Sequence, residues 1–559
     1  MKQGSFFYFL TVGVVVLLLT NIGGCSWLAR ERPLTLFQGG SQTTPAAAMF
    51  VPNQAPIMVS LLVNPDRLKG LRRRDRLELN KLKTSLLANT DLDYRRDIQP
   101  WLGDEITLAV SSIDIDRDAE NGRQTGYLMA IATANPTKSR EFLDLLFSKR
   151  AVAGRGLMSE QYKGVKLIYE NSRPQLDEQK VPQLSAKSMG MLSGAVVGDR
   201  FILFANHPTV LRDAINNVQA PGLSLTSSSQ YQQALTQLPP KRIGMSFLNL
   251  PTLAEWRALQ PAQKYQSQII TLELQRQGLL AETTLLATSS ESDSPLVPQS
   301  QPVMALQYIP ARTGVSIAGF DLSRLENTDL NQWIQSGKRS VQPLAELQGR
   351  WGIDLPQDIF SWVKGEYALG MLSDSNQTNP DWVFVAEKSD AAEQGISRLD
   401  AIASSQGLST NSLTLGEQKI STWAQLTTAP VSSSKPDRAS ITLKAKVQGV
   451  HATVGRYEIF TTSVEAMDEA LKAPQNGSVV DNPQFQASIA PIPKPNQGYL
   501  YLDWTASQEI LERQLPVLKL LEVLGNPFFS NLRSLTVSSY GSKTGLLKGG
   551  VFFRTNRIR

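Results

Sequence analysis

Residues 101–110 read WLGDEITLAV, and a related stretch, WVKGEYALGM, stands at residues 362–371. Both stretches begin with a tryptophan, place a glycine and a glutamate shortly after it, and continue into an apolar run. One match of this kind is weak evidence, but self-similarity that recurs along a chain indicates an internal repeat. The pair therefore predicts that the flanking sequence repeats as well.

The flanking segments do match, and they match in the same order. Upstream, the opening at residues 51–68 has a counterpart at residues 309–325, each with a proline followed by an apolar run. The further matches are 127–131 with 382–386, 197–204 with 454–460, 230–249 with 484–503, and 278–286 with 545–553. We therefore predict two tandem copies, at residues 46–287 and 303–559. Between them, the serine- and proline-rich residues 288–302 are predicted to form an exposed linker.

Hydrophobic periodicity assigns the elements of the first copy. Asn135-Pro136 and His207-Pro208 are predicted to begin helices, the second running through residue 215. A helix is also expected at residues 65–87. Strands are expected at residues 57–63, 105–111, 127–133, 196–204, 243–248, 269–274 and 279–287, the last two forming a hairpin. Because strands often follow strands directly, the predicted fold class is α+β, with each copy a largely antiparallel sheet whose helices cover one face.

The N-terminus has the composition of an export signal. Residues 6–19 read FFYFLTVGVVVLLL, Lys2 is the only charged residue before Arg30, and residues 22–25 read IGGC. A basic start, an apolar core and small residues before a cysteine indicate a lipoprotein signal over residues 1–25, with lipidation at Cys25. The uncharged stretch is also long enough for an uncleaved membrane anchor, and cleavage without an anchor is a third alternative. Residues 26–45 are then a tether.

The composition limits the chemistry that the chain can perform. The 559 residues carry a net charge of +6 and contain one cysteine and two histidines. One cysteine excludes an intramolecular disulfide and thiolate zinc sites, and the charge excess is too diffuse to indicate nucleic acid. No Gly-x-Gly-x-x-Gly or P-loop pattern is present to hold a phosphate. We therefore expect no catalytic site, no cofactor and no metal, and we predict that the protein is not an enzyme.

Four residues are candidates for a catalytic or ligand-binding role. His207 precedes a predicted helix and corresponds to Ser463 in the second copy, so a helix-start role explains both residues. His451 lies in a predicted strand and is expected to be a satisfied or edge histidine. Glu105 and its counterpart Glu366 could act as acid and base or bind a cation. The structural alternative, which we favour, is a turn in which the tryptophan packs, the glycine allows a tight backbone and the glutamate accepts bonds from nearby amides.

A basic stretch follows the first predicted strand. On a helix its charges would lie on the polar side, where they could contact an acidic partner or anionic lipid headgroups, or could simply face solvent. The residues are Arg67, Lys69, Arg72, Arg73, Arg74 and Arg76.

Together, the duplicated opening, the WLGDE-type turn and the lipoprotein-like start resemble a cyanobacterial family of exported proteins, domain of unknown function 3352. The resemblance covers about residues 46–559. It implies an exported, membrane-associated protein and supplies no catalytic residue.

We expect a binding or scaffold protein that is membrane-anchored and faces the periplasm or thylakoid lumen. Its partners would be the membrane, through the N-terminal lipid or helix, and a protein at that membrane, but not nucleic acid. An alternative is a carrier or sensor of a lipid or other apolar ligand, held between sheet and helices. A hydrolase acting through Glu105 or Glu366 is a third hypothesis.

Overall fold

A computed structural model of the chain describes residues 44–67, 92–118, 120, 122–171, 192–257, 265–287, 303–325, 349, 351–372, 380–430, 441–508, 531–543 and 545–555. The chain divides into two compact units, the first containing the described residues up to 287 and the second most of those from 303 on. Within the described ranges, no helix is both long and apolar enough to cross a membrane. The predicted signal or anchor, almost all of the tether, the linker at 288–302 and most of the predicted helix at 65–87 lie outside these ranges.

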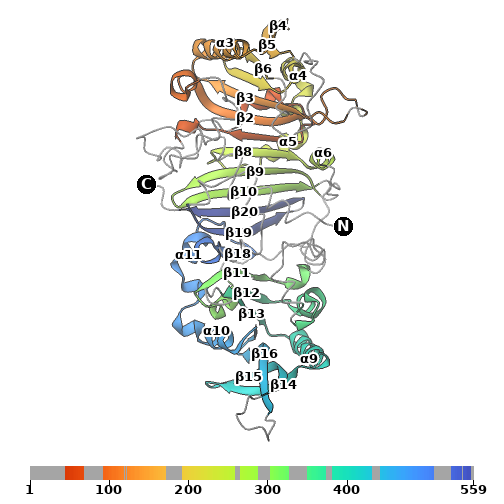
Figure 1. Ribbon diagram of the computed structural model, residues 1–559, viewed down its shortest axis with the longest axis vertical. Helices are drawn as coiled ribbons and strands as arrows, with labels where there is room; N and C mark the ends of the chain where they lie inside the picture. The colour runs from red at the N-terminus through yellow and green to blue at the C-terminus, as the bar shows by residue number, and fades with distance from the viewer. Residues whose placement is uncertain are drawn as a thin grey trace. The chain divides into compact units, whose positions relative to one another are not determined.

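The first unit is built on an antiparallel sheet with the strand order β4–β5–β6–β7–β3–β2–β1–β8–β9–β10 (Figure 1). All of the pairings that build it are antiparallel, as the sequence predicts. The strands are β1 (Ile57–Leu61), β2 (Leu102–Ser112), β3 (Gly126–Thr133), β4 (Leu157–Tyr162), β5 (Val165–Glu170), β6 (Ser193–Val197), β7 (Phe201–Ala205), β8 (Gly244–Asn249), β9 (Tyr265–Gln275) and β10 (Gly278–Ala287).

Helices α3 (Pro136–Val152) and α4 (Pro208–Gln219) cover opposite faces of this sheet. Alternate residues of a strand point to opposite faces. In β7, Phe201 and Leu203 pack in one core cluster with α4, whereas Ile202 and Phe204 pack in another cluster with α3. The expectation that helices cover one face is therefore wrong for this unit. The shorter helices are α5 (Ser229–Leu235) and α6 (Leu250–Trp256), with single turns at η2 (Ala46–Phe50), η4 (Tyr94–Ile98), η5 (Pro221–Leu223) and η6 (Leu225–Ser227).

The elements predicted on described residues are confirmed, with one correction and one hairpin that was not predicted. Asn135 caps α3, its side chain accepting the amide of Lys138, and the β9–β10 hairpin forms as predicted. The single strand predicted at 196–204 is instead the β6–β7 hairpin, because Gly198 takes a φ of +57° and reverses the chain. The hairpin of β4 and β5 was not predicted; its turn residues Lys163 and Gly164 both have positive φ.

The strand order of the second unit is β14–β15–β16–β17–β13–β12–β11–β18–β19–β20, and the pairings from β14 to β19 are again antiparallel. Every neighbour relation of the first unit thus has a counterpart in the second. The strands are β11 (Thr313–Phe320), β12 (Glu366–Leu372), β13 (Asp381–Glu387), β14 (Ser409–Leu415), β15 (Gln418–Pro430), β16 (Ile441–Val454), β17 (Tyr457–Thr461), β18 (Gly498–Asp503), β19 (Leu532–Lys543) and β20 (Leu546–Thr555).

The helices of this unit follow the same sequence of positions. They are η7 (Met304–Tyr308), η8 (Leu322–Leu325), η10 (Leu355–Ile359), η11 (Phe360–Trp362), α9 (Asp390–Ser405), α10 (Val464–Asn476), η12 (Val479–Asp481) and α11 (Pro483–Ile489). Buried tryptophans, Trp351, Trp362 and Trp423, form much of the core beneath α9. This aromatic core supports the part of the unit that carries the candidate site.

Candidate functional site

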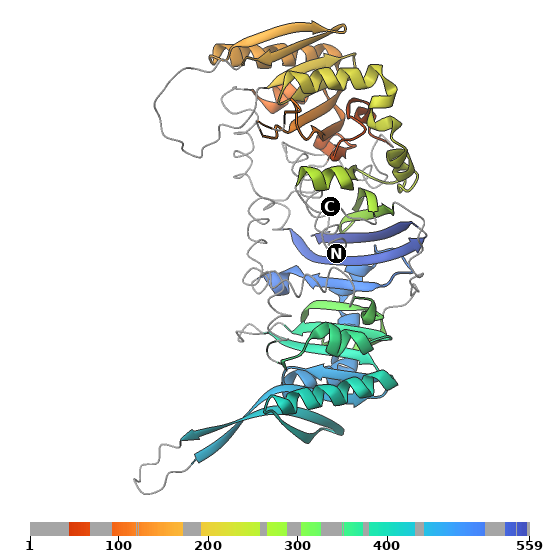
Figure 2. The same ribbon diagram turned by 90° about the vertical axis from the view of Figure 1, so that its right-hand side faces the viewer.

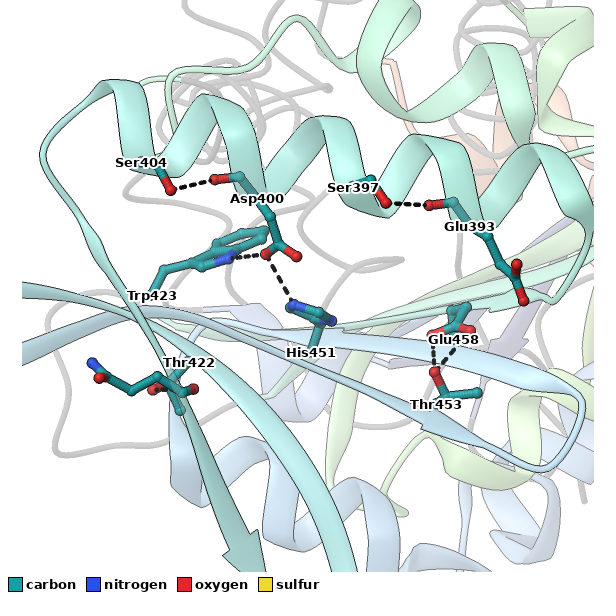
Figure 3. A network of polar contacts seen from close by, with 10 residues as sticks. Glu393, Ser397, Asp400, Ser404, Thr422, Trp423, His451, Thr453 and Glu458 are labelled. Atoms are coloured by element: carbon teal, nitrogen blue, oxygen red, sulfur yellow. Dashed lines mark hydrogen bonds and ion pairs between the residues drawn. The ribbon is translucent and has the colours of Figure 1, made fainter.

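A polar cluster of Asp400, Trp423 and His451 lies where α9 meets β15 and β16 (Figure 3). One carboxylate oxygen of Asp400, Oδ1, accepts the Trp423 indole N–H at 2.7 Å and lies 3.1 Å from Nε2 of His451. The three side chains come from three different elements. The cluster therefore ties the helix to both strands of the hairpin.

His451 is held in this cluster by the packing of its ring against other aromatic rings as well as by its Nε2 contact. It is only 8% exposed, stacks on Phe460 with centroids 5.7 Å apart, and packs beside Trp423 at 5.6 Å. Burial lowers the pKa of His451 more than the nearby Asp400 raises it, so the imidazole is neutral at pH 7. With the carboxylate as acceptor, Nε2–H is the donor, which fixes the tautomer.

The arrangement orients a histidine through a carboxylate. An Asp–His pair acts as a general base only when the second ring nitrogen reaches a nucleophile or a bound water. In the described part of the chain, the hydrogen-bond partner found for His451 is Asp400, and no group of acidic, histidine and cysteine side chains has the arrangement of a metal site. Because Asp400 bonds to both strands of the hairpin, the cluster braces the hairpin against α9. The prediction that His451 is a satisfied histidine is confirmed.

The first unit lacks this cluster at the matching positions. Leu146 follows the N-cap of α3 by the same number of residues as Asp400 follows that of α9, and it is buried in an apolar core. Gly194, three residues before the end of β6, matches His451, three before the end of β16, and a Cβ there would meet Leu143 and Phe147. The first unit therefore has its sheet without the polar trio, which in the second unit supports a further feature.

That feature is a long hairpin that the trio supports. We call residues 425–430 of β15 and 441–447 of β16 the arm. The pairing of β14 with β15 reaches only to Ala424, and that of β17 with β16 starts at Val450, so among the described residues the two strands of the arm pair only with each other. Figure 2 shows the arm continuing past α9 and β14.

The faces of the arm differ in character. Leu426 is 47% exposed and is paired with Ala445 on one face of the ribbon. Gln425 and Lys446 are paired on the other face, and both are exposed. A two-stranded ribbon is marginally stable in water unless a further layer covers it. At these two described pairs, the arm therefore exposes an apolar side chain on one face and a basic side chain on the other.

The base of the arm is shaped by a glycine. The register shifts between Trp423 and Ala424, and Gly449 lies opposite Trp423. A Cβ on Gly449 would come within 2.6 Å of the Trp423 ring and 3.2 Å of Nε1 of Trp351. Trp351 in turn donates to the Gln448 carbonyl at 2.8 Å. Only glycine leaves room for both indoles to brace the hairpin.

The two glutamates singled out in the sequence have structural roles. Glu105 is fully buried and accepts the amides of Ala46 and Ala47, both at 2.9 Å, and the Thr107 hydroxyl at 3.0 Å. Burial raises the pKa of Glu105, and these donors oppose that shift. Glu366 accepts the Tyr457 hydroxyl at 2.9 Å and the amide of Ala305 at 3.3 Å.

The tryptophans of the same motif confirm the structural interpretation of the turn. Trp101 and Trp362 are buried, and their indole N–H groups donate to the carbonyls of Asp97 and Asp358 at 2.7 and 2.6 Å. Each carbonyl lies four residues before its tryptophan, in the single helical turn that precedes β2 or β12. Each glutamate is held by the amides of its own unit and is distinct from the polar trio.

His207 and Ser463 are N-caps, as predicted. His207 Nδ1 accepts the Thr209 amide at 3.2 Å, and the Ser463 hydroxyl accepts the Ala466 amide at 3.1 Å. Of the predicted contact residues, Arg67 is exposed. Cys25, Lys69, Arg72, Arg73, Arg74 and Arg76 lie outside the described residues.

Sequence reasoning missed Asp400 and Trp423. One signal for Asp400 was available in the sequence. Asp400 is a charged residue directly after the buried Leu399 of α9, and the matching position of α3 carries an apolar residue, Leu146. Trp423 offered none, since its partners are 23 and 28 positions away.

Comparison with known proteins gives a family match without an activity. The chain matches the model of a family described as a protein of unknown function (DUF3352) over residues 10–555. No curated protein matches it. Crystal form I of TP0453 aligns with a TM-score of 0.24 and 9% identity over 45% of this chain and 82% of that one. Crystal form III of the same protein gives a TM-score of 0.24 and 10% identity over 45% and 84%.

Proposed function

The chain belongs to this family of proteins of unknown function, and from that premise we propose that it is a binding or scaffold protein, anchored to a membrane outside the cytoplasm. It would contact a protein partner through the arm. The observation that carries the proposal is the exposed Leu426 on a ribbon that no other described strand extends. A partner that packs on this face would supply the layer that the ribbon lacks.

The brace at the base makes the arm suited to binding. Asp400, Trp423 and His451 hold the hairpin in one direction relative to α9, so less conformational freedom is lost when a partner docks. Large apolar side chains such as Leu426 gain the most from being covered, whereas Lys446 on the other face favours an acidic surface nearby.

Anchoring rests on the sequence. The apolar run at residues 6–19 and the Ile-Gly-Gly-Cys box support lipidation at Cys25 or an uncleaved helix, and a body facing the periplasm or thylakoid lumen of a cyanobacterium. The basic stretch beginning at Arg67 would add a contact to lipid headgroups or the partner. We also propose that residues 46–287 and 303–559 are tandem copies. The recurring strand pairings support this duplication.

Site-specific photo-cross-linking tests the binding role. A photoreactive amino acid replaces Leu426 in the full chain, which carries a C-terminal tag, and the cells are irradiated before their membranes are solubilised. The matched control carries the same amino acid at Val152, which is 90% exposed on α3. We expect one defined protein adduct from position 426 and none from position 152. The same adducts from both positions, or none from either, would contradict the proposal, and a co-purified lipid would then favour the carrier alternative.

A second experiment tests the anchor separately. The Cys25→Ser chain and the unchanged chain are compared for incorporation of labelled fatty acid and for recovery with membranes. Loss of the label in the variant supports lipidation. An unlabelled chain that stays with the membrane supports the uncleaved helix, and recovery of the unchanged chain in the soluble fraction would contradict anchoring.

A further inference from the structure

β14 is a strand whose second edge is open. Among the described residues its only strand neighbour is β15, and all five residues from Thr410 to Thr414 are exposed. The connection to β15 is a two-residue turn, Gly416-Glu417. Counting from Leu415 toward the N-terminus, residues that share backbone hydrogen bonds with β15 therefore alternate with residues that do not. Asn411 is one of the bonded positions, and its carbonyl also accepts the Thr422 hydroxyl from β15 at 3.3 Å.

The backbone groups of the alternate residues therefore point outward. The N–H and C=O groups of Thr410, Ser412 and Thr414 face away from β15, and within the described ranges no backbone hydrogen bond to them is found. Such a row of donors and acceptors is a template for another strand.

β14 also lacks the features that protect other edges. Exposed edges are usually blocked by charged residues or proline. β14 reads STNSLTL and contains neither. The strand in the same position of the first unit, β4, does carry a charge at Glu160, which accepts two bonds from Arg212 at 2.7 and 2.8 Å. Both strands lie at the end of the described strand order, but only β14 lacks a charged residue.

The three residues of β14 whose backbone groups point outward, Thr410, Ser412 and Thr414, are symmetric in residue type about Ser412, whereas the residues between and beside them are not. In an antiparallel pair centred on Ser412, Thr410 of one copy lies opposite Thr414 of the other, and Ser412 lies opposite itself. The outward backbone groups of these three residues are then in register, and opposed threonines stabilise such pairs. No like charges meet, because the strand is neutral. We propose that two copies of this chain associate through β14, joining their sheets across a two-fold axis at Ser412. This inference is independent of the partner proposed for the arm.

Cysteine cross-linking tests the geometry directly. In the full chain carrying Cys25→Ser, Ser412→Cys introduces a single thiol at the proposed axis. Opposed residues of a bonded antiparallel pair are about 5.5 Å apart between Cα atoms, within the range of a disulfide. The matched control is Ser159→Cys on β4. We expect a disulfide-linked dimer from the Ser412 variant only. No dimer, or equal dimer from both variants, would overturn the proposal.

A charge at the same position tests the association without a cross-link. Ser412→Lys places two ammonium groups opposite each other in the dimer but changes only an exposed side chain in the monomer. Sedimentation equilibrium should show a dimer of the unchanged chain and at least about a tenfold rise in the dimer dissociation constant for the variant. The denaturation midpoint at low protein concentration confirms that the variant folds. A folded variant that dimerises as well as the unchanged chain would overturn the proposal.

Discussion

At the scale of single residues, the most informative group is the Asp400 carboxylate. One of its oxygens serves both the Trp423 indole and the His451 imidazole, so two buried donors depend on one acceptor. Removing an acceptor leaves its donors without partners, which costs more than the bond itself contributes. The matching residue of the first unit, Leu146, accepts no hydrogen bond through its side chain and contributes to stability through apolar packing.

We expect Asp400→Ala to destabilise the second unit by about 1–3 kcal/mol, because Trp423 and His451 lose their acceptor inside the core. Asp400→Asn is the matched control, since its amide oxygen can still accept one or both bonds, and its effect should be smaller. Chemical denaturation followed by circular dichroism gives the shift in midpoint. Equal midpoints for the alanine variant and the unchanged chain would show that the trio does not brace the fold.

His451 also predicts how stability changes with pH. Because burial lowers its pKa below the ordinary value of 6.5, the unfolded chain binds the proton more tightly than the folded chain. Stability contributed by the neutral imidazole is therefore complete above pH 6.5 and is lost as the pH falls toward the folded pKa. His451→Gln should flatten this part of the curve, measured as denaturation midpoint against pH. His207, whose pKa burial also lowers, remains in both proteins as an internal reference. Parallel curves would contradict this prediction.

At the scale of elements, local sequence signals predict structure where the cause is local. Asn135, His207 and the β9–β10 turn were all identified correctly, because a cap or a turn needs only neighbouring residues. The strand predicted at 196–204 failed because its apolar run hides a reversal at Gly198. The Asp400–His451 contact joins residues 51 positions apart, and it depends on the register of β15 and β16, which no local pattern fixes.

The arm depends on a glycine at its base, which gives a prediction at this scale. Gly449→Ala should destabilise the second unit by about 1–3 kcal/mol, because the added methyl meets the Trp423 ring and overpacks the two indoles. The control is Gly222→Ala, where a Cβ would meet no atom within 4 Å. Denaturation midpoints and near-ultraviolet circular dichroism of the tryptophans check both. Similar values for the two variants would show that the base tolerates the methyl group.

At the scale of the whole molecule, two units share a plan and differ in their interiors. Both use a buried tryptophan and a glutamate at the start of the matching strands β2 and β12, and both cap corresponding helices with a side-chain acceptor. Among the residues that the structure describes, the polar trio, the arm and the uncharged edge of β14 are found in the second unit alone. The shared features maintain the fold, and the features of one unit alone are those for which we propose binding and association.

Substitutions of Glu105 and Glu366 would test whether the matching glutamates contribute equally to the stability of the two units. Glu105 is fully buried and receives three bonds, two of them from backbone amides. The Glu366 side chain is 12% exposed and has one amide, the Tyr457 hydroxyl and the exposed Arg456, 3.9 Å away, as partners. Glu105→Gln turns its N–H₂ toward the backbone amide of Ala46 or Ala47, which cannot accept a bond, so we expect a loss of about 1–3 kcal/mol. Glu366→Gln can keep its oxygen on the Tyr457 hydroxyl and should lose less than about 1 kcal/mol. The shifts in denaturation midpoint compare the two. A larger loss at Glu366 would mean that the second unit, despite its more exposed carboxylate, depends more on this contact than the first.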